Sequence, residues 1–454
     1  MGTRTRGRDG LNTRPRRGFR TAGLGIVAIT LFFTLQSGTP RIYDVERHST
    51  QPNEPATASG PPTDPDLEFR AVDRAEYPES TTIDGNQSRP LLGLHPNPDT
   101  LDISTTNARR AALAYDAMQS TLFLPEARLY LETSPKVLEN EYSWVWPLSQ
   151  VFASTIDLTD LPGVGDAYRD EASRRLIALE SYWSPDNLPP AYSSYIAPPV
   201  GPGGDVFYDD NAWIGLELVR WYRETGDPAV LDRARLVFDY VASGWEDDPS
   251  VAAPGGIYWT RASGNQNRNT VSTAPGAELA LHLYQLTGEQ TYLDWGQRMY
   301  DWVNTYMLGP DGLFLDHMDL QGNISPWVFS YNQGAMIGAN VMLYRISGDD
   351  GYLRRAEEVA RLSLEKYASG AFDDQSVYIN TIFFKKLLML YAHNGNVSYI
   401  VAMQDYADRI WDTQVDPATS LMMTRDLYIL IDQAAIVQLY ASLAALDEPT
   451  DTLP

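Results

Sequence analysis

The chain of 454 residues contains no cysteine, which excludes a disulfide framework, a thiolate-bound metal and a lipid anchor on an N-terminal cysteine. Histidine is almost as scarce: the five histidines are scattered, and no two stand at a ligand spacing on one helix face. We therefore expect the protein to hold no metal ion and to need no cofactor.

Positive charge is also in short supply. Lys and Arg number 35 against 59 Asp and Glu, which gives a formal net charge of −24. Seven arginines lie in the first twenty residues, so the rest of the chain is more acidic still. An acidic surface argues against a nucleic-acid partner, because nucleic acids are bound by basic stripes. It is compatible with a neutral polymer.

The N-terminal part of the chain lacks the pattern of a folded domain. An arginine-rich start precedes a largely apolar, uncharged run from Ala22 to Leu35. This run is shorter than the ~20 residues of a typical spanning helix, and it predicts an export signal or uncleaved signal anchor over residues 1–38. Residues 39–100, rich in Pro, Thr and Ser, predict a flexible linker. We expect a monomer that is extracellular, either secreted or tethered to the membrane by this N-terminal anchor.

Residues 101–446 predict a folded domain, followed by a short tail over 447–454. A glycine-centred turn recurs in it at intervals of roughly 60 residues, the last interval being shorter. Each glycine is placed to end one helix in the left-handed conformation, and its polar neighbour is placed to start the next. Such a recurrence indicates stacked helical hairpins. The turns are Gly165-Asp166, Gly226-Asp227, Gly288-Glu289, Gly348-Asp349 and Gly395-Asn396.

The helices on the two sides of these turns differ in pattern. Helices before a glycine are apolar on nearly every side, which indicates burial, whereas those after it carry one apolar stripe. The predicted inner helices span residues 144–158, 211–225, 275–287, 333–347, 379–392 and 429–444. The predicted outer helices span residues 104–120, 166–183, 228–243, 290–306, 351–368 and 399–413. This alternation predicts an all-α (α/α)6 barrel or toroid of six inner and six outer helices; a linear helical solenoid is the alternative.

In an antiparallel alternation, all six inner helices begin at one end of the barrel. The loops that enter them are long, whereas the loops at the other end are short glycine turns. Long loops that converge on the mouth of a scaffold are where binding sites are built, and helix N-termini favour carboxylates electrostatically. We therefore expect the functional site at this mouth.

Two adjacent carboxylates, Asp209 and Asp210, stand in one of these loops, between Tyr208 and Asn211. Cleavage of a glycosidic bond needs two carboxyl groups, and aromatic faces stack on sugar rings. Neighbours on a regular helix diverge by about 100°, so we expect an irregular helix entrance that lets both reach one sugar. The alternative is a helix cap, which Asp and Asn favour. Three further Asp-Asp pairs serve as comparison, at residues 247–248, 349–350 and 373–374.

Other mouth residues suit contacts with a sugar. Tyr258 and Trp259 are candidates for a stacking platform, or for a packed loop that covers the mouth. Asp316 is a polar residue of the rim. The remaining candidates precede or open inner helices and suit hydroxyl recognition, capping or core packing. They are Tyr331, Asn332, Gln333 and Trp144, together with Tyr208 and Asn211 beside the carboxylate pair.

Three ordered motifs resemble those of glycoside hydrolase family 76, the endo-α-1,6-mannanases. They are Tyr208-Asp209-Asp210-Asn211-Ala212-Trp213-Ile214-Gly215, Gly255-Gly256-Ile257-Tyr258-Trp259 and Tyr331-Asn332-Gln333-Gly334. The resemblance covers about residues 103–444 and implies an (α/α)6 fold, an α-mannan polysaccharide or oligosaccharide as substrate, and retention of anomeric configuration. It implies that Asp209 is the nucleophile and Asp210 the acid/base. The sequence departs from the family pattern at Thr273-Ala274-Pro275-Gly276, where an Asn-Gly-type start is expected.

The resemblance and the carboxylate pair lead to a retaining hydrolase of α-1,6-mannosidic bonds that works by double displacement. Three rival functions remain at this point. The same intermediate suits a transglycosylase acting on α-mannan, and the same scaffold suits a non-catalytic mannan-binding protein. A different (α/α)6 enzyme, such as an unsaturated uronyl hydrolase or a sugar epimerase, is disfavoured by the acidic mouth and by the lack of a histidine pair.

Overall fold

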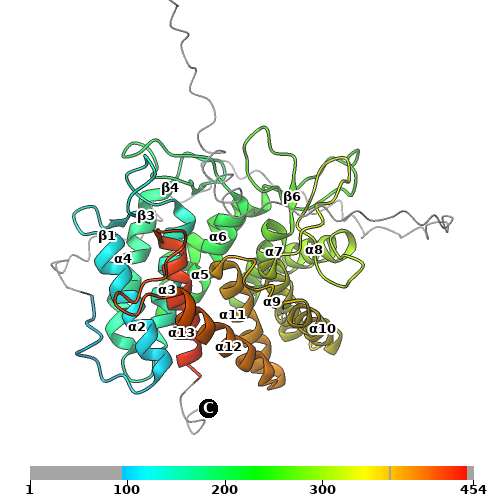
Figure 1. Cartoon of the computed structure of the whole chain (residues 1–454). Helices are drawn as coiled ribbons and strands as arrows, with labels where there is room; N and C mark the ends of the chain where they lie inside the picture. Colours follow the sequence, from blue (N-terminus) through cyan, green and yellow to red (C-terminus); the bar gives the residue numbers. More distant parts are fainter. Residues whose placement is uncertain (1–94, 368–369, 447–454) are drawn as a thin grey trace, which may run out of the picture. The chain divides into compact units, whose positions relative to one another are not determined.

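The computed structural model describes residues 95–367 and 370–446, which form a helical domain (Figure 1). The predicted export segment over 1–38, nearly all of the predicted linker and the tail over 447–454 lie outside the described residues. Buried along most of their length, six α-helices form the inner layer of this part. They are α3 (Val145–Thr159), α5 (Tyr208–Thr225), α7 (Thr270–Thr287), α9 (Ser330–Ser347), α11 (Val377–Asn394) and α13 (Leu430–Ala444).

Six further helices of the described part cover the inner layer. They are α2 (Thr106–Leu122), α4 (Arg169–Leu179), α6 (Pro228–Ala242), α8 (Gln290–Tyr306), α10 (Asp350–Tyr367) and α12 (Ser398–Gln414). The two layers differ as their patterns predict: α9 is buried continuously from Ser330 to Leu343, whereas α8 buries one stripe that includes Trp295, Met299 and Trp302. The prediction of an all-α barrel of inner and outer helices is confirmed.

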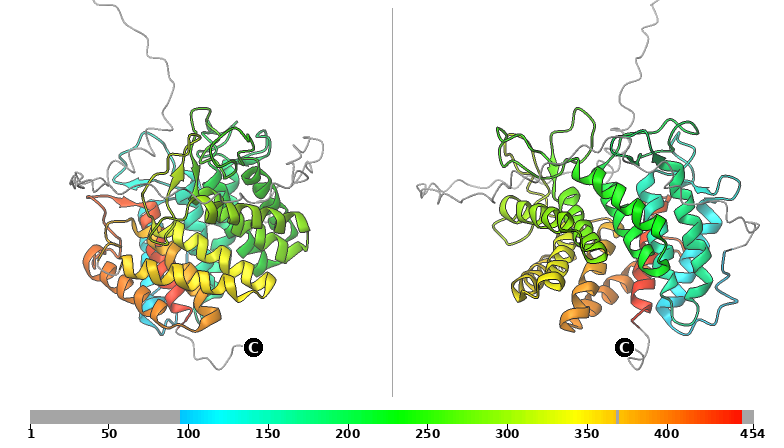
Figure 2. Two further views of the ribbon diagram at one scale, coloured as in Figure 1. Left: turned by 90° about the vertical axis from the view of Figure 1, so that its right-hand side faces the viewer. Right: turned by 180° about the vertical axis from the view of Figure 1, so that it is seen from behind.

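The inner helices form a closed ring. Each packs against the next in chain order, and the last of them, α13, packs against the first, α3. The linear solenoid is therefore excluded. Outer helices pack on their inner neighbours, α6 on α5 and α8 on α7, for example, while α2 packs on α13 and so covers the place where the ring closes (Figure 2).

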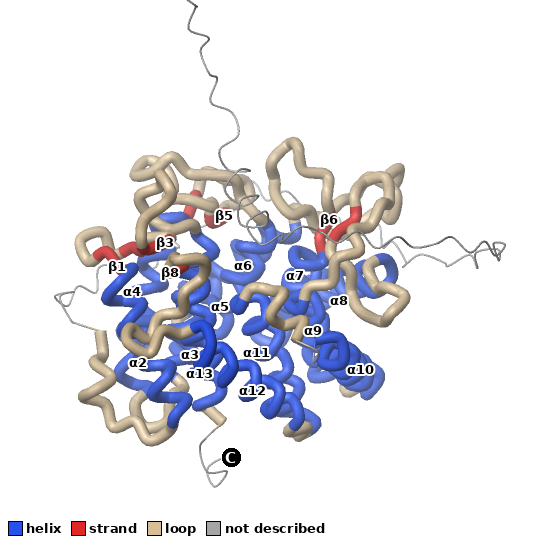
Figure 3. Tube along the Cα trace, viewed as in Figure 1, coloured by secondary structure: helices blue, strands red, loops and turns tan. Residues whose placement is uncertain are grey.

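One end of the ring carries the long loops and all the short strands of the described part (Figure 3). The pair β3 (Thr133–Ser134) and β8 (Tyr428–Ile429) joins the loops that enter the first and last inner helices. The pair β6 (Arg268–Asn269) and β7 (His317–Met318) joins the loops that enter α7 and α9. Two further pairs are hairpins, β1 (Phe123–Leu124) with β2 (Leu129–Tyr130) and β4 (Trp183–Ser184) with β5 (Ala191–Tyr192). These pairings give the mouth a fixed rim.

Four of the five predicted glycine turns have the expected conformation. Gly226, Gly288, Gly348 and Gly395 are left-handed C-caps with φ between 64° and 72°. The prediction for Gly165 is wrong, because α3 ends at Asp160 and the left-handed residue nearby is Gly163. Glycine is needed at 165 for another reason: a Cβ there would lie 1.9 Å from the carbonyl oxygen of Thr159.

The predicted start of α7 at residue 275 is also wrong. The helix begins at Thr270, whose backbone N–H and hydroxyl bond to the carbonyls of Asp316 and Leu315. The pairing of β6 with β7 thus sets the start of α7, and Pro275 lies inside the helix.

In the described part of the chain, no helix combines the length and apolar character that a membrane crossing requires.

Away from the mouth, buried ion pairs cross the ring. Lys385 of α11 bonds to Asp157 of α3 at 2.7 Å, and the neighbouring Lys386 bonds to Glu278 of α7. Although burial acts to raise the pKa of Glu278, the Lys386 ammonium and the His282 side chain hold it at about 2. The Glu278 carboxylate, 1% exposed, therefore depends on Lys386 for compensation of its charge.

Lys386→Met is expected to lower the free energy of unfolding by about 3–5 kcal/mol, because it leaves Glu278 charged and buried without its cation. Urea denaturation followed by circular dichroism measures this change. Lys366→Met, at an exposed position of α10, is the matched control and should change stability by less than about 0.5 kcal/mol. Equal stability of the two variants would contradict the assigned importance of this ion pair.

Candidate active site

Asp209 and Asp210 occupy the second and third positions of α5, at the mouth. The chain reaches the helix through an extended residue, Phe207, which forms an antiparallel bridge with Thr260. The backbone N–H of Tyr208 donates to the carbonyl of Trp259 at 2.9 Å. The expectation of an irregular entrance is therefore wrong, because this bridge lets a regular helix begin at Tyr208. Both carboxyls are nevertheless held together in the first turn, 9% and 8% exposed.

One oxygen of Asp209 is fixed and the other has no protein partner. The Trp259 indole N–H donates to Oδ2 at 3.1 Å, and the Trp259 ring packs edge-on against Phe207. Oδ1 is buried without a hydrogen bond. Burial raises the pKa of Asp209 to about 7, although the Trp259 N–H and the backbone N–H groups of Asp210 and Asp209 favour the charged form. Asp209 thus has one oxygen, Oδ2, held by Trp259, and a second oxygen, Oδ1, without a protein partner.

Asp210 is in a different environment. Burial, followed by the charge of Asp209, raises the pKa of Asp210 well above its usual range. The adjacent carboxyls therefore have unequal proton affinities: Asp209 is the first to ionise, and Asp210 keeps its proton. Two titratable groups whose pKa values are pushed apart in this way can act as a base or nucleophile and as an acid.

Three predicted residues from the neighbouring loop and α9 lie beside this pair. Asp316 has one oxygen 2.8 Å from His317 Nδ1, and its other oxygen accepts from Asn332 Nδ2 at 3.5 Å. The Asp316 charge contributes to the raised pKa of Asp209, and both carboxylates, after burial, raise that of Tyr331. The side-chain oxygen of Asn332, Oδ1, is buried without a hydrogen-bond partner. The structure therefore brings Asp209, Asp316, Tyr331 and Asn332 into one polar site.

Comparison with known proteins places this site in a family. The family model described as glycosyl hydrolase family 76 matches residues 105–425, which is most of the chain. The chain belongs to glycosyl hydrolase family 76. The resemblance of the three motifs is thus confirmed, and the match covers all six outer helices and every inner helix except α13.

Curated relatives of this family 76 chain include two enzymes of the yeast Saccharomyces cerevisiae. A mannan endo-1,6-alpha-mannosidase, DCW1 of Saccharomyces cerevisiae, is 30% identical over 148 residues, 30% of this chain and 32% of the relative. DFG5 of the same yeast, with the same enzyme name, is 27% identical over 213 residues, 44% of this chain and 41% of the relative. The match therefore spans about a third of the length of DCW1 and about two fifths of that of DFG5.

Solved structures from family 76 share the fold. The mannosidase Bt3792 of Bacteroides thetaiotaomicron is 25% identical, with a TM-score of 0.68 over 76% of this chain and 99% of that one. An inactive α-1,6-mannanase variant of Salegentibacter, with two consecutive aspartates replaced by asparagine, was solved with α-1,6-mannotriose. It is 19% identical, with a TM-score of 0.61 over 75% of this chain and 100% of that one, and this likeness concerns the fold.

Asn211 and Gln333, two candidates for sugar contacts, use their amides on the backbone. Asn211 Nδ2 donates to the carbonyls of Tyr192 and Phe207, and its Oδ1 accepts from the Tyr192 N–H. Gln333 makes the same three bonds with Phe314 and Phe329. Both amide hydrogens of each side chain are therefore occupied, and substrate contact by either residue stays a prediction.

These two amides belong to a repeat that the sequence reasoning missed. A polar side chain stands at the fourth position of five inner helices and bonds to the backbone of the loop that enters the helix. These residues are Asn211, Thr273, Gln333, Asn380 and Gln433. Their recurrence parallels that of the glycine turns, and this signal was present in the sequence. Thr273 lies in the segment that departs from the family 76 pattern, yet it still anchors the entering loop. Its hydroxyl donates to the carbonyl of Asn269 and accepts from the backbone N–H of Ile257.

The remaining candidates have mixed surroundings. Tyr208 is buried and stacks on Tyr240, with ring centroids 4.7 Å apart, so it packs in the domain. The Tyr258 hydroxyl donates to Glu246, and Trp259 supports Asp209 as described. Trp144 caps α3 on another part of the rim, where its N–H donates to Glu132. Sugar contacts by these four residues remain predictions.

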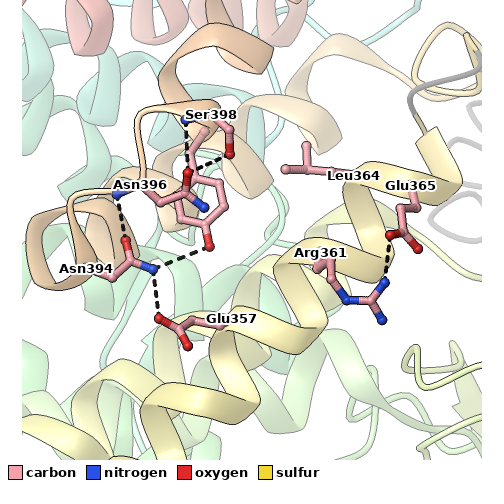
Figure 4. A pocket seen from close by; sticks show the side chains of 8 residues that line it. Glu357, Arg361, Leu364, Glu365, Asn394, Asn396 and Ser398 are labelled. Carbon is pink, nitrogen blue, oxygen red and sulfur yellow. Dashed lines mark hydrogen bonds and ion pairs between the residues drawn. The ribbon is translucent and has the colours of Figure 1, made fainter.

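Two other groups of residues are set apart from the site. The Asp-Asp pairs at 247–248, 349–350 and 373–374 are exposed, unlike Asp209-Asp210. A surface depression lies on the outer wall between α10 and the turn that joins α11 to α12 (Figure 4). Its polar side chains bond to one another, Asn394 to Glu357 and Arg361 to Glu365. In the described part of the chain, no group of three or more metal-ligating side chains is placed to hold an ion.

Proposed function

We propose that this protein is a retaining glycoside hydrolase that cleaves α-1,6-mannosidic bonds in mannan or its oligosaccharides. The observation that carries the proposal is the buried, unequal pair Asp209 and Asp210, with a free Oδ1 on Asp209. The family model and the enzyme names of the yeast relatives support the choice of bond. The bacterial variant with two replaced aspartates, inactive and bound to α-1,6-mannotriose, supports the choice of residues.

In the proposed mechanism, Asp209 Oδ1 attacks the anomeric carbon while Asp210 gives its proton to the leaving oxygen. The C–O bond of the leaving sugar breaks as the bond to Asp209 forms. Asp210, now ionised, takes a proton from water, and the resulting hydroxide displaces Asp209 from the sugar. Two displacements return the original anomeric configuration. The Trp259 N–H holds Asp209 Oδ2 throughout, which leaves Oδ1 for the attack.

The test is digestion of linkage-defined α-manno-oligosaccharides, with product anomers followed by NMR. We expect cleavage of α-1,6 bonds alone, with the first-formed product in the α configuration. Longer products would instead support the transglycosylase, and binding of α-1,6-mannan without release of reducing ends would support a non-catalytic binding protein. Export by the segment at residues 1–38 is part of the proposal, since a mannan substrate lies outside the cell that secretes the enzyme.

The pH dependence of kcat/KM follows from the unequal pair. Because Asp209 must be ionised, the rate is expected to rise as the pH increases through about 7 and to fall again where Asp210 loses its proton. Trp259→Phe removes a hydrogen bond that favours the Asp209 carboxylate. The rising limb should therefore move to higher pH in this variant. An unchanged limb would mean that another group controls it.

A further inference from the structure

A second pair of buried acids lies at the mouth, away from Asp209 and Asp210. Glu132 precedes β3, and Asp432 is the third residue of α13; they are 4% and 5% exposed. Helices α13 and α5 both pack against α3, one on either side. Asp432 therefore has the same place in α13 that Asp210 has in α5. The mouth thus carries two acidic pairs, separated by the first turn of α3.

Aromatic side chains lie near both pairs. Trp146, in the first turn of α3, packs edge-on against Tyr378 of α11 with ring centroids 5.2 Å apart. The charges of Asp432 and Glu132 act on Tyr378, while Tyr331 interacts electrostatically with Tyr378, Asp316 and Asp209. Trp146, Tyr378 and Tyr331 stand in the first turns of three inner helices, α3, α11 and α9, at the mouth.

Hydrogen bonds within the protein account for one oxygen of each carboxyl in the second pair. Glu132 Oε2 accepts the N–H of Trp144 at 3.0 Å, and Asp432 Oδ2 accepts the Thr424 hydroxyl at 2.8 Å. Glu132 Oε1 is buried with no partner, which is the condition of Asp209 Oδ1, and the indole N–H of Trp146 is also without a partner. A neutral side chain would cap α3 equally well, so the packing alone gives no reason for two neighbouring acids.

The chemistry of the second pair suits neutral hydroxyl groups. Burial raises the pKa of Glu132 to about 7, with a further contribution from Asp432, and burial raises that of Asp432 to about 6. Such a pair offers both a proton donor and free acceptor oxygens, and a sugar hydroxyl needs both. The Trp146 and Tyr378 rings supply the apolar surface on which a sugar ring packs.

We propose that Glu132 and Asp432 form a sugar-binding subsite that holds the hydroxyl groups of a neutral hexose unit neighbouring the unit at Asp209. The inference rests on the proposed function, since it places a second unit of the same oligosaccharide. It assigns to the pair a share of the affinity for long substrates and no part in bond cleavage.

The experiment uses the full chain in an Asp209→Asn/Asp210→Asn background and α-1,6-mannotetraose as the probe. Calorimetric titration is expected to give an affinity at least tenfold weaker after the further change Glu132→Gln/Asp432→Asn. Glu141→Gln/Asp426→Asn, at exposed positions of the same two loops, is the matched control and should stay within twofold. The glutamine keeps an acceptor for the Trp144 N–H, so the melting temperature should not fall.

Other outcomes refute either the subsite or the proposed function. An affinity within twofold of the parent would overturn the subsite, as would a loss of affinity accompanied by a loss of thermal stability. Binding of glucosamine that depends on the pair, with mannotetraose unaffected, would overturn the neutral hexose. Reducing-end release by the unmodified chain separates the two proposals: its absence refutes the proposed function, whereas normal release together with unchanged mannotetraose affinity refutes the subsite alone.

Discussion

Asp209→Asn is expected to lower kcat on α-1,6-linked mannan by on the order of 10⁴-fold or more, because an amide cannot form the covalent intermediate. Asp210→Asn should lower it by about 10²–10⁴-fold, since general acid–base catalysis contributes that much. The loss should be smaller for Asp210→Asn on substrates whose leaving group needs no proton. Reducing-end release by the purified variants measures both effects.

The fold should survive these changes. Burial raises the pKa of both carboxyls, so an amide at position 209 removes a charge that the site disfavours, and an amide at position 210 replaces a carboxyl that already holds its proton. The melting temperatures are therefore expected to equal or exceed that of the parent at pH 8. Asp373→Asn/Asp374→Asn alters an exposed pair and serves as the control for activity. Full activity in the Asp209 or Asp210 variant would refute the assignment of the catalytic pair.

Arg268→Met is expected to destabilise the mouth severely. The guanidinium of Arg268 is fully buried and donates to the carbonyls of Ala253, Gly255, Ala252 and Asp319. Methionine fills similar space but leaves four carbonyls without this donor, and each unsatisfied buried group costs about 1–3 kcal/mol. We expect a loss of at least about 3 kcal/mol in unfolding free energy and a lower kcat, because the loop bound by Arg268 carries Trp259.

Chemical denaturation and steady-state kinetics on the same preparation measure the two effects of this change. Arg261→Met, at an exposed position of the same loop, is the matched control. If Arg268→Met retained the stability and kcat of the control, the guanidinium would not be what holds the loop in place. A loss of stability with unchanged kcat would separate the fold of the loop from the position of Trp259.

The layers of the barrel were predictable because burial leaves a direct mark on the sequence. A helix such as α9, surrounded by other helices, has almost no polar side, whereas α8 has one clear polar face. Helix starts were harder to place, since contacts between loops decide them. Two such contacts are the bridge from Phe207 to Thr260 and the strand pair before α7. Both join residues that are distant along the chain, so no local sequence pattern predicts them.

The same distinction applies to the site. Asp209 and Asp210 are adjacent in sequence and stand among aromatic residues, so they could be identified directly. Glu132 and Asp432 are three hundred residues apart, and only closure of the ring brings them together. The amides of Asn211 and Gln333 suit sugar recognition as well as backbone anchoring, and the sequence does not say which of their hydrogen bonds are made within the protein.

The pairing of β3 with β8 has a consequence for how the chain folds. An open array of repeats can gain or lose terminal units one at a time, because each unit depends only on its neighbours. Here the first inner helix, α3, packs against the last, α13. The barrel is therefore incomplete until the residues up to about 444 have been synthesised and α13 has packed beside α3. Unfolding should then be a single concerted event, and a truncation before α13 would leave α3 and α2 exposed along an entire side.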